Sequence, residues 1–97
     1  MVKHIVMFKL QGSDEARREV ALRVKAALDE LPSQIDVLQS IETALNENHD
    51  EDWDIVLTAI VPTLADVATY AKHPAHVAAA AIIKDAKQAR ACVDYTC

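Results

Sequence analysis

Alternating apolar and polar residues predict a strand at the start of the chain. Within residues 2–10, one set of alternate positions is apolar except for a single histidine, and the other set mixes apolar residues with lysines. This period of two is typical of a β-strand, because successive side chains point to opposite faces. His4 is the polar exception on the more apolar face. We expect an apolar layer to cover this strand on at least one side.

A helical spacing follows. Apolar residues recur at steps of three and four from Ala16 to Leu31, which predicts an amphipathic helix with one buried stripe. Ser13 is a suitable N-cap for this helix, and Pro32 is expected to end it near residue 31. Gly12 is the only glycine in the chain, and we expect it to provide a positive φ in the preceding turn.

Two further strands are predicted in the middle of the chain. Residues 35–46 contain Val, Ile and Thr but have mixed parity, which favours a strand with a bulge or a strand covered on both faces. A charged loop over residues 46–52 separates it from residues 53–61, a nearly continuous apolar run of the kind that central strands have. Pro62 is expected to end this second strand.

A broken helix and a last strand complete the pattern. Thr63 begins a short helix in a manner similar to a capping box. The helix breaks at His73, because the residue before a proline avoids the α region. His73 is expected to cap a second helix that runs from Pro74 to about Arg90, since proline suits the first helical position. Residues 92–96 predict a final strand.

The order β-α-β-β-α-β predicts an α+β fold of the ferredoxin-like type, a single domain over residues 1–97. Its antiparallel four-stranded sheet would carry helices on one face only. The first and third strands look apolar on both faces, so the other face needs a cover. The simplest cover is the sheet of a second copy, which predicts a homodimer with a barrel-like core, a dimeric α/β barrel.

Charge, apolar runs and cysteine spacing make several classes of function less favourable. The net charge of −5 and the absence of a basic run disfavour nucleic acid binding. No apolar run approaches the ~20 residues of a membrane span, and the N-terminus does not resemble a signal peptide. Cys92 and Cys97 lack a CxxC spacing. We expect two free thiols, one buried and one at a frayed end, in a reducing cytoplasmic compartment.

The densest polar chemistry lies between Tyr70 and Val77. His76 falls in the first turn of the second predicted helix, where the helix dipole disfavours a cation and should lower the imidazole pKa. A neutral imidazole is what a general base requires. The phenol of Tyr70 could donate to a carbonyl oxygen or to His76, and His4 is a candidate third polar group.

Each of these residues also has a structural interpretation. Tyr70 has the apolar spacing of its helix and fits a core tyrosine with a satisfied hydroxyl. His4 and His76 fit hydrogen-bonded core histidines. His73 and His76 are three residues apart, but the break at Pro74 spoils the shared helical face that a metal-binding pair needs. We therefore predict no metal site.

The chain resembles the stress-responsive dimeric α/β barrel family, known as Dabb, over nearly its whole length. The resemblance rests on the Y-x-x-H-P-x-H core at residues 70–76 and on residues 2–9, 54–56 and 93–95. It implies the ferredoxin-like fold and a dimer formed through the sheets. One class in this family, the plant olivetolic acid (polyketide) cyclase, closes a polyketide by an aldol reaction without cofactor or metal.

The resemblance to this cyclase implies site residues one by one. His76 matches its catalytic base, Tyr70 matches the tyrosine that holds the substrate carbonyl, and His4 matches a pocket histidine. The predicted substrate-binding residues are His4, Phe8 and Asp54, although Asp54 stands where the cyclase has a histidine. The first helix also lacks the large aromatic residues of the cyclase, so polyketide specificity is not implied.

Three functions are compatible with these observations. The first is a cofactor-independent lyase or cyclase that acts on a small carbonyl compound in an apolar pocket, with His76 as base. The alternative is a non-catalytic dimer that binds an apolar ligand or protects under stress. The third, a monooxygenase that degrades haem or oxidises quinols, rests only on the sharing of the dimeric barrel fold.

Overall fold

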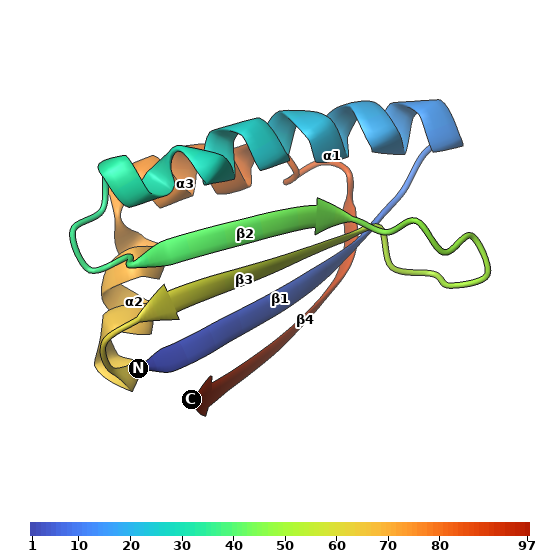
Figure 1. Cartoon of the computed structure of the whole chain (residues 1–97). Coiled ribbons are helices and arrows are strands. Elements are labelled where there is room, and N and C mark those ends of the chain that lie inside the picture. The colour runs from blue at the N-terminus through green and yellow to red at the C-terminus, as the bar shows by residue number, and fades with distance from the viewer.

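Four antiparallel strands form one sheet in the order β2-β3-β1-β4 (Figure 1). The structure is a computed structural model that describes all of residues 1–97. β1 and β3 are the two central strands, so each of them pairs with a neighbour on both edges. The strands are β1 (Val2–Leu10), β2 (Ser40–Leu45), β3 (Ile55–Val61) and β4 (Lys87–Thr96).

The helices lie on one face of this sheet, and Figure 1 shows the opposite face without any covering element. The order of elements and the antiparallel sheet confirm the predicted α+β ferredoxin-like fold. No helix has the length and apolar character needed to cross a membrane. The helices are α1 (Asp14–Asp29), the short 3-10 helix η1 (Leu31–Ser33), α2 (Leu64–Lys72) and α3 (Pro74–Ala81).

The predicted helix starts are confirmed. The Ser13 side chain accepts a hydrogen bond from the backbone of α1, after Gly12 with a φ of 119°. A full capping box between Thr63 and Asp66 begins α2. The ring of His73 then accepts from a backbone N–H at the start of α3. Each contact satisfies a donor that the first turn of a helix would otherwise leave free.

The prediction of a strand from residue 35 was wrong, since β2 begins only at Ser40. Leu31, Ile35 and Leu38 are buried at helical spacings. Backbone hydrogen bonds from Ile35 to Leu31 (2.9 Å) and from Leu38 to Ile35 (3.1 Å) form successive turns. The apolar residues at positions 35 and 38 therefore belong to turns that extend η1. Similarly, α1 ends at Asp29, two residues before the predicted end.

The predicted length of the last helix was also wrong. α3 ends at Ala81, and β4 begins at Lys87 instead of residue 92. Pairing with β1 explains the difference, because β4 follows β1 along its whole length as far as the partners Leu10 and Lys87. The ladder hydrogen bonds of this long pairing outweigh the helix propensity of residues 87–90. In addition, β3 begins at Ile55 and not at residue 53.

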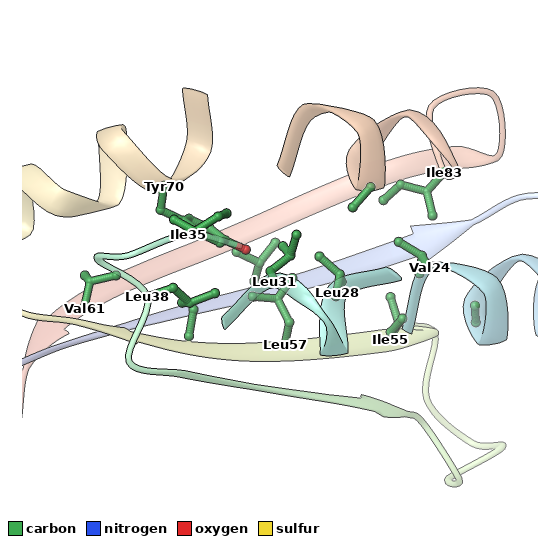
Figure 2. Packing of buried hydrophobic residues seen from close by; sticks show 14 of the residues in the cluster. Val24, Leu28, Leu31, Ile35, Leu38, Ile55, Leu57, Val61, Tyr70 and Ile83 are labelled. Carbon is green, nitrogen blue, oxygen red and sulfur yellow. The ribbon is translucent and has the colours of Figure 1, made fainter. Parts of the chain in front are cut away.

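The core lies between the sheet and the helices, and Figure 2 shows part of it. On the opposite side of the sheet, apolar residues alternate with the core positions and stay partly or largely open to solvent. Val93 is 61% exposed and Tyr95 is 44% exposed. We call this side the outer face, and its apolar members are Ile5, Met7, Val56, Ile60, Val93 and Tyr95.

Candidate functional site

A cavity of about 470 Å³ lies between the helix-covered side of the sheet and the helices. Most of its wall is apolar and includes Phe8, Val24, Leu28 and Leu57. We call it the site cavity. A volume of this size suits a small organic molecule. The polar groups of its wall are His4, Tyr70, His76, Lys87, Arg90, Cys92 and Asp94.

His76 lines the cavity from the first turn of α3. Its Nδ1 lies 3.0 Å from the backbone carbonyl oxygen of Ala71. A carbonyl oxygen only accepts, so Nδ1 donates, and the neutral ring then carries its lone pair on Nε2. Burial lowers the pKa of His76, the charges of His4 and Arg90 lower it further, and the Ala71 carbonyl opposes them. The direction agrees with the prediction from sequence, but the largest cause is desolvation by burial and not the helix dipole.

The rings of the three residues singled out by sequence meet in this cavity. Tyr70, in the last turn of α2, is only 1% exposed, and Figure 2 shows it pointing inward to the other core side chains. Its ring centroid lies 4.5 Å from that of His76, with the planes tilted by 59°. It also meets the His4 ring edge to face at 5.8 Å. Packing of this kind fixes the orientation of the rings.

The hydroxyl group of Tyr70 is buried and has no hydrogen-bond partner. It therefore does not donate to His76, and it is not the satisfied hydroxyl of an ordinary core tyrosine either. An unpaired buried hydroxyl costs about 1–3 kcal/mol. Burial raises the pKa of Tyr70 to about 12, so the phenol stays protonated at neutral pH. Tyr70, one of the residues that line the cavity, thus carries a neutral donor that lacks an acceptor.

His4 pairs with a carboxylate from the neighbouring strand. It lies directly opposite Asp94 in the β1-β4 ladder, and its Nδ1 is 2.5 Å from Oδ1 of Asp94. The Sγ of Cys92 lies 3.5 Å from the same Nδ1. A nucleophilic relay needs contacts at both ring nitrogens, so these residues do not form one. Desolvation and the charge of Asp94 also raise the pKa of Cys92, which disfavours the reactive thiolate.

The same three residues are also the best candidates for a metal site. The potential ligand atoms of His4, Cys92 and Asp94 lie within 4.8 Å of one another, and all three residue types bind zinc. Two nitrogen or oxygen ligands of a tetrahedral ion stand about 3.3 Å apart at normal bond lengths. The 2.5 Å separation between His4 and Asp94 is that of a hydrogen-bonded pair, so an ion would have to separate them.

The two other predicted site residues lie in different places. Phe8 lines the site cavity. Asp54 does not; it lies beside a second, polar pocket at the other end of β1. Its carboxylate accepts from the backbone N–H of Leu10 at 2.7 Å and from Nε of Arg17 at 3.2 Å. Asp54, which directly precedes β3, therefore links β1 to α1 and is apart from the His76 cluster.

Four polar residues of the cavity received no role from the sequence: Lys87, Arg90, Cys92 and Asp94. The last three alternate along β4, which is the available signal that they share a face. Their opposition to β1 depends on the strand register. The expectation that one cysteine is buried was wrong, since Cys92 and Cys97 are both exposed free thiols. β4 is an edge strand, so its side chains stay partly open to solvent.

Solved structures that are similar to this chain include proteins described as dimeric and ferredoxin-like. A dimeric protein of unknown function from Bacteroides fragilis is 45% identical, with 99% of this chain and 95% of that chain covered and a TM-score of 0.96. A protein from Arabidopsis thaliana is 22% identical, with 100% and 95% covered and a TM-score of 0.77. The hydroxynitrile lyase from Passiflora edulis is 12% identical, with 97% and 90% covered and a TM-score of 0.73.

The last two likenesses show the fold alone, because both identities are low. A comparison with curated proteins gave no match. The sequence profile of one family, the stress responsive A/B barrel domain, matches residues 2–97. The chain therefore belongs to the stress responsive A/B barrel domain family.

Proposed function

We propose that the protein is a cofactor-independent lyase or cyclase that acts on a small carbonyl compound, with His76 as the general base. The observation that carries the proposal is the hydrogen bond between Nδ1 of His76 and the Ala71 carbonyl. It leaves the lone pair of the neutral ring on Nε2, and burial favours that neutral form by lowering the pKa. A positioned neutral imidazole can remove a proton from carbon next to a carbonyl group.

The remaining groups suit the steps that follow. Loss of the proton creates an enolate, whose carbon attacks a second carbonyl group and forms the new bond. The resulting alkoxide takes a proton back from His76. The Tyr70 hydroxyl, which lacks an acceptor, is a suitable donor to a carbonyl oxygen as negative charge develops there. The hydroxynitrile lyase from Passiflora edulis has the same fold, which supports the proposal only by analogy.

A simple diketone tests this chemistry without knowledge of the natural substrate. Heptane-2,6-dione can exchange its α-protons in deuterated water. It can also close by an aldol reaction to a hydroxycyclohexanone, which loses water to give a cyclohexenone, and NMR follows both events. We expect the wild-type protein to accelerate proton exchange and His76→Gln to abolish the acceleration. His49→Gln is the matched control, because His49 lies in an exposed loop away from the site cavity.

The results also separate the proposal from its alternative. Equal rates for wild type and His76→Gln would reject the role of His76 as base. Binding of the diketone without any exchange or closure would favour the non-catalytic alternative, in which the dimer only holds or protects a ligand. If the exchange rate falls equally in His49→Gln, the loss is not specific to His76, and the result does not support its role as base.

We further propose that the protein is a homodimer that joins its outer faces. Val93 and Tyr95 leave much apolar surface open there, and the relative from Bacteroides fragilis is a dimeric protein. Val93→Glu should give a monomer in light scattering coupled to size-exclusion chromatography, because the charge would be buried between the sheets. Val77→Glu is the control, since Val77 is 55% exposed on α3. A wild-type monomer would contradict the proposal.

A further inference from the structure

Positive charge gathers on one wall of the site cavity. Lys87 and Arg90 both line it from β4, although the chain as a whole has a net charge of −5. Arg90 lies opposite Phe8 in the ladder and Lys87 lies opposite Leu10. Phe8 itself lines the cavity, so this stretch of β4 borders the same space as His76.

Neither cation is neutralised by the protein. The ion pairs of the structure join Lys9, Arg17, Lys25 and His4 to carboxylates, and none includes Lys87 or Arg90. The only carboxylate in the cavity wall, Asp94, is bonded to His4. Two cations therefore face the cavity against one carboxylate that already has a partner, which favours an anionic ligand.

The charge of Arg90 acts on the proposed reaction centre. After burial, it is one of the influences that lower the pKa of His76, and it opposes the rise in the pKa of Tyr70. Arg90 and His76 also line the same cavity, so one molecule in it can reach both. Arg90 and Lys87 are both exposed, so this part of the wall is open to an entering ligand. Arginine also matches a carboxylate with two parallel hydrogen bonds.

We propose that the ligand of the site cavity is a carbonyl compound that carries a carboxylate, held by Arg90 with help from Lys87 while its carbonyl end lies against His76 and Tyr70. The apolar wall between these points, with Phe8 and Leu57, suits the hydrocarbon part of a keto acid. The identity of the reacting end rests on the proposed function. The recognition of the carboxylate rests on the two unpaired cations alone.

A matched pair of probes isolates the carboxylate. The keto acid 3-benzoylpropanoate and its methyl ester differ only in charge and one methyl group, and NMR titration of the labelled protein gives both affinities. We expect the acid to bind about tenfold more tightly than the ester, the value of one partly exposed charge-assisted contact. Arg90→Gln should remove most of this preference, and Lys87→Gln should remove a smaller part. Arg23→Gln, on the exposed side of α1, should leave it unchanged.

Equal binding of acid and ester, or no binding of the acid, would overturn the proposal. An acid preference that survives undiminished in Arg90→Gln, or that falls equally in Arg23→Gln, would also overturn it. His76→Gln separates this proposal from the proposed function: the variant should keep the acid preference, and a failure of proton exchange with that preference intact would reject the base and leave the anion site standing.

Discussion

Two partly exposed carboxylates, Asp54 and Asp94, lie near opposite ends of β1 and differ in how completely their surroundings are paired. Asp54 accepts from a backbone N–H of β1 and from Arg17 of α1, so the groups around it satisfy one another. Asp94 pairs with His4, but the neighbouring groups retain unused capacity. The Tyr70 hydroxyl has no acceptor, and Arg90 has no anion.

This difference between the two clusters distinguishes a structural role from a functional one. A polar cluster in which every donor and acceptor has a partner stabilises the fold and has no free group to bind a ligand. A cluster with a free lone pair, a free hydroxyl donor and unpaired cations around a cavity is poised for a ligand instead. Substitutions near Asp54 should therefore change stability, whereas those near Asp94 should change binding and rate.

The largest expected effect is on rate. His76→Gln should lower the rate of α-proton exchange by about 10²–10⁴-fold, the usual value of a positioned general base. Its free energy of unfolding should stay within about 0.5 kcal/mol of wild type, because His76 is only partly buried. NMR exchange and urea unfolding on the same sample measure the two values. A large loss of stability would show that His76 has a mainly structural role, like Asp54.

The next effect is on stability. Asp54→Ala should lower the free energy of unfolding by about 2 kcal/mol, since the buried N–H of Leu10 loses a charged acceptor. The pair with the partly exposed Arg17 adds little. Urea denaturation measures the change, with Asp52→Ala as control, because Asp52 is 84% exposed and holds Lys9 only at 3.9 Å. Loss of probe binding at unchanged stability would contradict the structural role.

A smaller effect of opposite sign is expected at Tyr70. Tyr70→Phe removes a buried hydroxyl without a partner, so the free energy of unfolding should be unchanged or higher by up to about 1 kcal/mol. The same change should weaken the binding of ketones if the hydroxyl meets the carbonyl oxygen. Urea unfolding and NMR titration with heptane-2,6-dione give both values. Clear destabilisation would show that the hydroxyl has a partner in the folded protein.

The smallest effect is on the pH dependence of stability. The pKa of His76 is lower in the folded protein than its ordinary value of 6.5, so the unfolded chain takes up the proton more readily. The stabilisation is complete above pH 6.5 and is lost as the pH falls from there to the folded pKa. Urea unfolding at about pH 7.5 and about pH 5.5 should show a larger loss in wild type than in His76→Gln. Equal losses of unfolding free energy in the two proteins would argue against a lowered pKa of His76.

The fold was predictable because its signals are local. The alternation of β1, the stripe of α1, and the caps at Ser13, Thr63 and His73 each depend on neighbours in the chain. Periodicity and capping act over a few residues, so the pattern β-α-β-β-α-β followed from sequence. The cluster of His4, Tyr70 and His76 was also expected, from the resemblance to the family together with the helix break at His73.

Only the tertiary structure decided where α3 ends and what β4 contributes. Residues 82–90 suit a helix locally, but pairing with β1 draws Lys87–Arg90 into the sheet. The same register places Asp94 opposite His4 and brings Arg90 to the cavity, whereas Asp54 joins Arg17 at the far end. Sequence alone determined which residues can carry chemistry. The long-range pairing of two strands decided which of them meet, because hydrogen bonding between distant segments is not encoded in local periodicity.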